Sequence, residues 1–218
     1  MKTWIAALCT SLTLLAGVAH GSANPVVYQQ GPSGAPNAYA SQFDTGANGD
    51  FSKVYDDFSL AVDTTITDIH WFGQYFSGSR TTGVDSFLIQ FWSDSNAAPG
   101  SVLYAATVSS ASETLVSGDT YSYDVDLANV FLAQAGTTYW VSIQATMLFP
   151  PQWGWSEGTG GNGTAVQDFV GTRSAIGFDM TFSLTGTPTS RLPEPASVLL
   201  VGLALTGVGF ARRAKAKR

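Results

Sequence analysis

The chain is nearly without cysteine and histidine. Its only cysteine is Cys9, and its two histidines are His20 and His70. A single thiol excludes a disulfide scaffold, and the lack of any thiol after Cys9 excludes a thiolate metal site or a catalytic thiol in the rest of the chain. Two histidines exclude most zinc chemistry and leave His70 as the one candidate base for a serine triad.

Basic residues are scarce between Asn24 and Ser190. This part holds three basic residues against fifteen acidic ones, a net charge of 3 − 15 = −12. Such a surface repels phosphate backbones, so we expect no nucleic-acid partner. The 218 residues are 12% aromatic and only 12% charged. That composition is typical of a folded chain and not of a disordered one.

Residues 1–23 have the form of a secretory signal peptide. Lys2 is followed by an apolar stretch over residues 4–18, which is the order of a basic and then a hydrophobic region. Cleavage after Gly21 and cleavage after Ala23 both fit, and we favour Ala23. The alternative is an uncleaved anchor helix. Cleavage would remove Cys9 and leave a mature protein without any thiol.

Residues 192–218 contain three features in a fixed order. They are the tripeptide Pro193-Glu194-Pro195, an apolar run of 16 residues over 196–211, and a basic tail that begins with Arg212 and Arg213. The run is slightly shorter than the ~20 residues of a comfortable membrane-spanning helix. The prolines favour extended backbone before it, and the basic tail predicts a cytoplasmic C-terminus.

This order of features resembles the PEP-CTERM sorting signal of Gram-negative bacteria. The resemblance covers residues 192–218 and implies a substrate of exosortase, a membrane protease-transpeptidase that recognises the tripeptide. It also implies an inner-membrane-anchored precursor with a periplasmic body, which reaches the cell surface or the extracellular space after processing. Association with exopolysaccharide is implied as well. The alternative is an ordinary tail anchor preceded by prolines.

Between these two ends, residues 24–184 predict a single antiparallel β-sandwich of the jelly-roll type. Hydrophobic residues alternate with polar ones in four segments, 86–92, 121–127, 139–145 and 178–184, and more weakly in 53–60, 66–72, 102–108 and 165–170. Short strands at this spacing, separated by Gly, Pro and Asn turns, are typical of two packed sheets. Residues 185–191, with Gly186 and Pro188, are expected to form a short tether.

The body also resembles, more loosely, sandwich domains often found with such tails. The segments that carry this resemblance include Asp56-Asp57-Phe58 and Ala98-Pro99-Gly100. No activity comes with it. We therefore expect a non-catalytic structural or glycan-binding module.

Two tryptophans are the candidates for ligand binding. Trp153 and Trp155 follow Pro150-Pro151 and precede a glycine-rich stretch. An exposed tryptophan in a loop can stack on a sugar ring. The alternative is that both residues close the end of the core. A glycan-binding module predicts that they are exposed, and a scaffold without a ligand predicts that they are buried. Trp71 and Trp92, on expected strands, are more simply explained by burial.

A secreted polysaccharide-degrading enzyme is the alternative from another class. Glycosidases need two carboxyl groups about 5–10 Å apart across a cleft. Asp124 and Asp126 share one face of an expected strand, with Cα atoms roughly 6–7 Å apart from the strand rise. Glu113 and Glu157 are the only glutamates of the body. Fifteen acids produce chance pairs in any sandwich, so a solvated acidic face is favoured.

Calcium and a serine triad are the remaining candidates, and neither is favoured. Residues 44–50 carry oxygen ligands at a loop-like spacing but depart from the EF-hand pattern at Gly46 and Tyr55. His70 would share a strand face with Asp68, but no Gly-x-Ser-x-Gly sequence occurs in the body. We expect no cofactor, with structural calcium as the only alternative.

Overall fold

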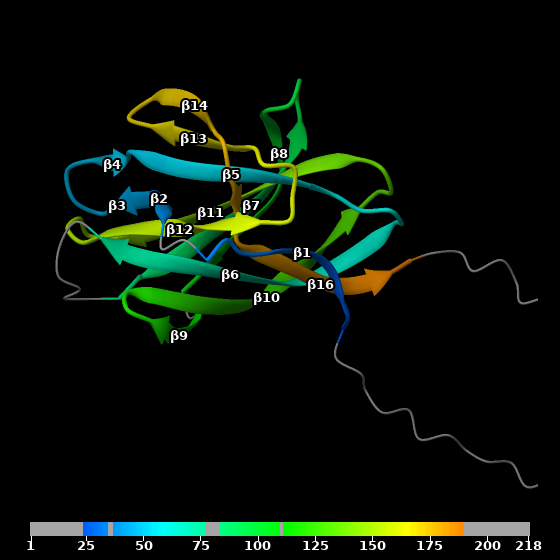
Figure 1. Cartoon of the computed structure of the whole chain (residues 1–218), viewed down its shortest axis with the longest axis horizontal. Helices are drawn as coiled ribbons and strands as arrows, with labels where there is room; N and C mark the ends of the chain where they lie inside the picture. Colours follow the sequence, from blue (N-terminus) through cyan, green and yellow to red (C-terminus); the bar gives the residue numbers. More distant parts are fainter. Residues whose placement is uncertain (1–23, 35–36, 77–82, 110, 190–218) are drawn as a thin grey trace, which may run out of the picture.

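The computed structural model describes residues 24–34, 37–76, 83–109 and 111–189, which are all-β (Figure 1). These residues form sixteen strands and no helix. None of them belongs to a helix long and apolar enough to cross a membrane. The expected signal peptide, the end of the expected tether and the expected sorting signal lie outside the described residues.

The strands form two eight-stranded sheets. The first contains β1 (Val26–Pro32), β2 (Ala38–Ala40), β6 (Thr64–Phe76), β9 (Ser112–Ser117), β10 (Thr120–Ala133), β12 (Gln152–Thr159), β15 (Asp179–Met180) and β16 (Phe182–Pro188). The second contains β3 (Gln42–Asp44), β4 (Gly49–Asp50), β5 (Ser52–Ser59), β7 (Ser86–Asp94), β8 (Pro99–Val108), β11 (Thr138–Met147), β13 (Ala165–Phe169) and β14 (Thr172–Ile176).

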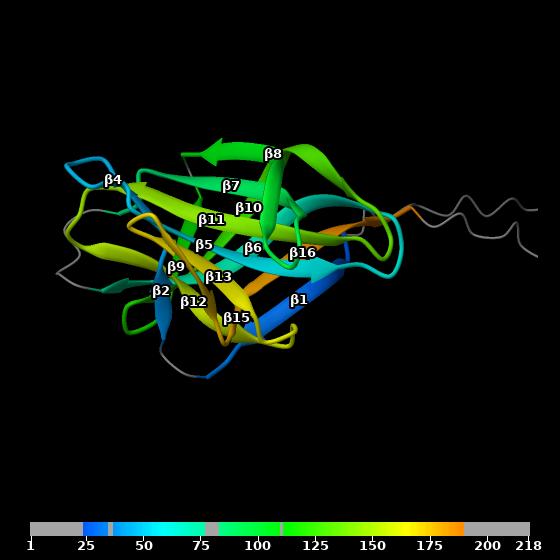
Figure 2. The ribbon, with the colours of Figure 1, turned by 90° about the horizontal axis from the view of Figure 1, so that it is seen from above.

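The two sheets are arranged as a sandwich, and Figures 1 and 2 show them from two directions. The first sheet follows the order β15-β12-β1-β16-β6-β10-β9, with β2 beside β12. The second follows β14-β13-β5-β11-β3-β4, with β7 between β11 and β8. The strands pair antiparallel except β3 and β11, which are parallel. The expected β-sandwich is therefore confirmed, with one parallel pair in it.

Alternation along the strands supplies the core between the sheets. Ile66, Ile69 and Trp71 of β6 are buried, and so are Ile89 and Phe91 of β7, while the residues between them are more exposed. Large side chains of this kind stabilise a fold by about 1.5–3 kcal/mol each when fully buried. The core is thus built from the inward residues of both sheets, as the period of two predicts.

The C-terminal part of the sandwich is longer than expected. The segment 178–184 is divided into β15 and β16, and β16 continues to Pro188 beside β6. Gly186 allows this continuation, because a Cβ atom there would lie 2.2 Å from the carbonyl oxygen of Thr65. Residues 185–188 therefore belong to the sheet, and the expectation of a tether is wrong for them.

Strand β11 is buried on both faces, although its sequence predicts one wetter face. Trp140, Ser142 and Gln144 are all nearly inaccessible. The Ser142 hydroxyl accepts a hydrogen bond from the indole of Trp92, and the amide of Gln144 donates to Asp50 and to the carbonyl of Ser52. Neighbouring strands on both sides of β11 supply these partners, which the sequence of β11 alone does not reveal.

Candidate functional site

Trp153 and Trp155 are core residues. Both lie on β12 and are fully buried. The Trp153 indole donates to the Tyr123 hydroxyl at 3.0 Å, and the Trp155 indole donates to the carbonyl of Thr181 at 2.7 Å. A sugar needs an exposed ring face, so these residues are not the ligand-binding residues. The structure matches the alternative, in which they close the core.

Glycines explain why the sequence did not reveal β12. Gly154 and Gly158 interrupt the hydrophobic alternation and resemble a turn. In the structure they allow close packing: a Cβ atom at Gly154 would lie 2.5 Å from the ring of Phe76. At Gly73 of β6 a Cβ atom would lie 2.2 Å from the Trp153 ring. The missing side chain of Gly73 makes room for Trp153, and that of Gly154 lets β12 pack closely against Phe76.

Among the other tryptophans, Trp71 is buried as expected. Trp92 is only partly buried and lies on the outer face of the second sheet. Its ring meets the ring of Tyr55 edge-on, with centroids 5.4 Å apart. Trp140 and Val166 pack into the same small cluster outside the main core.

Two basic residues, Lys53 and Arg173, lie beside the aromatic rings of this cluster. The ammonium group of Lys53 lies 5.9 Å from the Trp92 ring centre, and the guanidinium of Arg173 lies 5.4 Å from the Tyr55 ring centre. These distances are in the range of cation–π attraction. We call this surface the cation–aromatic face; it consists of Lys53, Tyr55, Trp92, Trp140, Asp168 and Arg173.

Asp168 organises the polar part of the cation–aromatic face. Its carboxylate receives two hydrogen bonds from Arg173, Nε to Oδ1 at 2.7 Å and Nη2 to Oδ2 at 2.8 Å. The Tyr55 hydroxyl donates to Oδ2 at 3.1 Å. The Arg173 guanidinium lowers the pKa of Asp168, and burial raises the pKa of Tyr55. Donors, acceptors and ring faces are thus held in fixed positions.

A hollow of about 410 Å³ opens on the cation–aromatic face. Its lining combines the side chains already described with residues of β4, β5 and the turn before β14: Asp50, Phe51, Ser52, Lys53, Tyr55, Asp168, Gly171 and Arg173. Phe51 meets Phe169 edge-on at its border, and Phe169 is 45% exposed. Both the lysine and the arginine of the described residues therefore line one hollow that also has aromatic walls.

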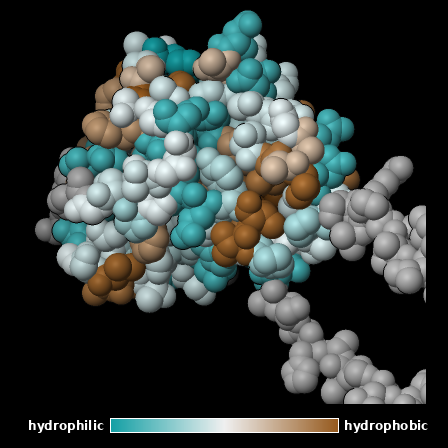
Figure 3. All heavy atoms as spheres, turned by 45° about the vertical axis from the view of Figure 1, so that its right-hand side comes forward, coloured by the Kyte–Doolittle hydropathy of each residue, from teal (hydrophilic) through white to brown (hydrophobic). Residues whose placement is uncertain are grey.

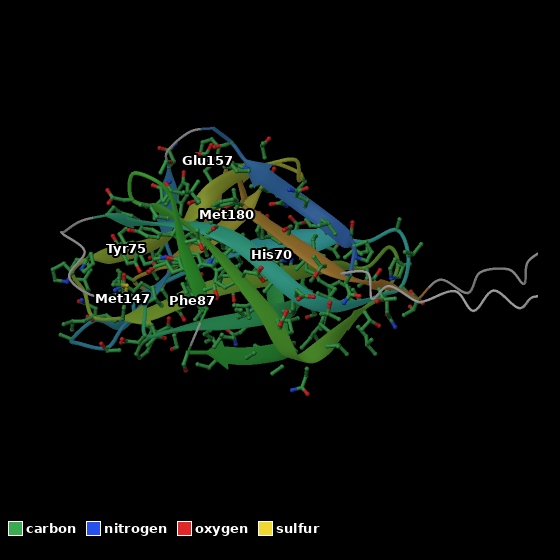
Figure 4. All side chains as sticks on the ribbon, turned by 90° about the horizontal axis from the view of Figure 1, so that it is seen from below. His70, Tyr75, Phe87, Met147, Glu157 and Met180 are labelled. Atoms are coloured by element: carbon green, nitrogen blue, oxygen red, sulfur yellow. The ribbon has the colours of Figure 1, made fainter. Side chains whose placement is uncertain are left out.

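The outer face of the first sheet carries like charges instead. Asp68 and His70 of β6 stand directly opposite Asp126 and Asp124 of β10, and Figure 4 shows His70 on this face. His70 Nδ1 lies 3.2 Å from Asp124 Oδ1. We call these four residues the carboxylate–histidine face. A hollow of about 310 Å³ lies beside His70 and Asp124.

The carboxyl groups of Asp68 and Asp126 interact, and their pKa values move in opposite directions. Partial burial acts to raise the pKa of Asp68, but hydrogen bonds from Asp126, Thr67 and Thr185 outweigh it and lower that pKa. The hydrogen bond to Asp68 and the charge of Asp68 raise the pKa of Asp126.

This arrangement does not match the pair of carboxyl groups that a glycosidase needs. Asp124 and Asp126 share a strand face, as the sequence predicts, but Asp124 faces His70 and Asp126 contacts Asp68. Hydrogen-bonded carboxyl groups are closer than the ~5 Å of the retaining geometry. His70 and Asp68 also share a face, but the acidic neighbour of the imidazole is Asp124.

The two glutamates of the body lie on different strands and are held by neighbours. Glu113 of β9 accepts hydrogen bonds from the hydroxyls of Tyr75 and Tyr123. Glu157 of β12 is 7% exposed and accepts from the amide of Asn37. Figure 4 labels both Tyr75 and Glu157. These contacts are of the kind that hold strands together.

The sequence did not predict the structural role of two buried aspartates, Asp56 and Asp179. Asp179 accepts the backbone N–H groups of Gly161 and Gly163, and Asp56 accepts those of Asp57 and Met180. Burial raises the pKa of Asp56 well above its usual range. Both side chains use their oxygens to fix backbone near the end of β12. No motif marks such residues, because three of the four backbone N–H groups, those of Met180, Gly161 and Gly163, are far from their aspartate in the sequence.

The calcium candidate is a loop-stabilising aspartate. Asp44 is buried, and its two oxygens accept four N–H groups, from Gly46, Phe149 and twice from Asn48. These four hydrogen bonds use the lone pairs that a cation would need and lower the pKa of Asp44 against the effect of burial. Within the described ranges, no group of three or more His, Cys, Asp or Glu side chains is placed to hold a metal ion.

The sorting residues Pro193, Glu194, Pro195, Arg212 and Arg213 lie outside the described residues.

Comparison with known proteins places the body in one family. No curated protein and no solved structure matches the chain. A family model described as "Domain of unknown function (DUF7901)" matches residues 26–174, from β1 into β14. The match includes both outer faces and ends before β15 and β16, which complete the first sheet. Because it covers more than half of the 218 residues, the chain belongs to the DUF7901 family.

Proposed function

We propose that this chain is an exported, exosortase-processed protein of the cell surface or extracellular matrix. Its sandwich, of jelly-roll-like topology, acts as a non-catalytic module that binds exopolysaccharide. The signal-like residues 1–23 and the PEP-CTERM-like residues 192–218 support export and tail processing. Before processing, a helix over 196–211 holds the precursor in the inner membrane with the body in the periplasm.

The cation–aromatic face is the observation that supports sugar binding. Aromatic rings provide apolar surface for the C–H groups of a pyranose, and fixed polar groups provide orientation. Here Phe51 and Tyr55 of the hollow supply rings, and the Arg173–Asp168 pair supplies donors and acceptors for hydroxyl groups. The cations are paired with Asp50 and Asp168 in a body that is acidic overall. These charges favour a neutral polysaccharide over a strongly anionic one.

Affinity electrophoresis of the full chain in detergent tests this proposal, with neutral and uronate-rich exopolysaccharides in the gel. We expect neutral polysaccharide to retard the protein. Phe51→Ala should weaken binding about tenfold, which corresponds to the ~1.4 kcal/mol of a lost ring contact. Its fold should survive because Phe51 is only partly buried.

Leu115→Ala is the matched control, since it removes an apolar side chain of 59% exposure from the first sheet. Equal retardation of wild type and Phe51→Ala, or an equal loss in the control, would refute this binding surface. Release of new reducing ends from the polysaccharide would favour the alternative, a polysaccharide-degrading enzyme.

Intact mass of the protein from the envelope and medium of the source cells tests export and processing. We expect a form that begins near Asn24 and ends near 193–195, and any excess mass reports an attached group. Glu194→Ala should leave the tail in place. A wild-type form that still carries the basic tail would contradict exosortase processing and leave an inner-membrane-anchored sandwich.

A further inference from the structure

The first and last described residues of the sandwich lie side by side. The amide of Asn24 donates to the Thr67 hydroxyl at 3.0 Å, and its oxygen accepts from Thr187 at 3.3 Å. The Thr189 N–H donates to the carbonyl of Asp63 at 2.7 Å. The chain therefore enters and leaves the sandwich at one end, on the right in Figure 1.

This end exposes large apolar side chains. We call them the exit patch: Val26, Val62, Val130 and Leu132, with exposed fractions of 55%, 40%, 51% and 66%. Leu132 stands opposite Thr65, and Thr65 stands opposite Thr187, two residues before the described chain ends. Figure 3 turns this end toward the viewer and shows apolar side chains gathered there.

Strand pairing explains the exposure of Val130 and Leu132. Strand β9 covers β10 only over residues 120–124, so the later part of β10 pairs with no other strand of the described residues on that side. Phe131 and Ala133 point into the core, and the residues between and before them point outward. The sandwich therefore exposes an apolar surface at the place where the chain exits.

The length of the following chain limits what this surface can meet. Six residues, 190–195, separate Thr189 from the apolar run 196–211. Even fully extended, the seven steps from 189 to 196 span only about 25 Å. A sandwich joined to a membrane helix by so short a connection must keep its exit end near the bilayer surface.

We propose that the exit patch is a membrane-contact surface. It lies against the headgroup–acyl boundary of the bilayer that holds residues 196–211, so the sandwich is seated on the membrane with its exit end down. This inference rests on the proposed membrane anchoring of the precursor and adds its lipid partner. The contact is apolar, so it should persist at high salt.

Lipid quenching of the full-length precursor tests the proposal. Cys9→Ser leaves no other thiol, so a single fluorophore can be placed by Leu132→Cys, by Leu115→Cys on β9, or by Leu203→Cys in the tail. The vesicles contain phosphatidylethanolamine, phosphatidylglycerol and a doxyl-labelled lipid. We expect about threefold stronger quenching at position 132 than at 115, since interfacial apolar surfaces reach about 5–10 Å into the boundary.

Quenching at position 203 distinguishes a failure of the membrane contact of the exit patch from a failure of the proposed membrane anchoring. Strong quenching at 203 with equally weak quenching at 132 and 115 would overturn the membrane contact and leave the anchored precursor intact. Absence of quenching at 203 would overturn both. Loss of the difference between 132 and 115 in high salt would also contradict an apolar contact.

Discussion

The two outer faces of the sandwich use the same strand geometry for opposite electrostatic purposes. On the cation–aromatic face, Arg173 and Asp168 form a two-point ion pair against the ring of Tyr55. On the carboxylate–histidine face, Asp126 lies opposite another carboxyl group, that of Asp68, and not opposite a cation. The ion pair with Arg173 lowers the pKa of Asp168, and the contact with Asp68 raises the pKa of Asp126.

The difference shows that the neighbouring side chains determine whether an aspartate of this acidic body is paired with a cation or lies beside another carboxyl group. Cations are too few to pair with every carboxylate, and the two that the structure describes gather at one hollow. Aromatic side chains gather there as well and form a small second cluster. A surface with rings, donors and acceptors is suited to a polar ligand, whereas the other face is suited to solvent.

The largest expected effect that separates the two faces comes from the aromatic cluster. Trp140 is 3% exposed and donates to Asp94 Oδ1 at 2.9 Å. Trp140→Ala should lower the free energy of unfolding by about 3 kcal/mol, because it leaves a cavity in the outer aromatic cluster. Chemical denaturation of the full chain in detergent measures this.

Phe72→Ala is the matched control on the other face, where this aromatic residue is only half buried. We expect a loss below about 1 kcal/mol there, since surface changes are small. Equal losses for the two variants would show that the outer cluster contributes no more stability than an ordinary surface ring.

A smaller effect concerns acid titration. As pH falls, Asp126 should become protonated before Asp168 does, because the pKa of Asp126 is raised and that of Asp168 is lowered. The stability linked to Asp168 is present above its unfolded pKa and is lost as pH falls through its lowered pKa. The contribution of Asp126 has the opposite sign and is lost as pH rises through its raised pKa.

Carboxyl-carbon NMR titration measures both groups in one sample. Asp68→Asn should return the pKa of Asp126 toward its usual value, and Arg173→Gln should raise that of Asp168. If both aspartates titrate together in the unmodified protein, the electrostatic contrast between the faces does not exist.

The sequence predicts a strand correctly where hydrophobic and polar residues alternate within that strand. The alternating segments 86–92, 121–127 and 139–145 are strands, because a half-buried strand must alternate with a period of two. The prediction failed at β12, where glycines replace the outward residues, and at 185–188, where Gly186 resembles a linker. It also failed for the structural roles of Asp56 and Asp179, which accept hydrogen bonds from the distant backbone groups of Met180 and Gly161.

The sequence by itself determined the fold class and the acidity of the body, since both follow from composition and local periodicity. It also determined the resemblance of the ends to a signal peptide and a sorting signal. Only the tertiary structure decided that Trp153 and Trp155 are buried, that the cations gather on one face, and that apolar residues surround the exit of the chain. The physical reason is that burial and pairing depend on neighbouring strands, which come from distant parts of the sequence.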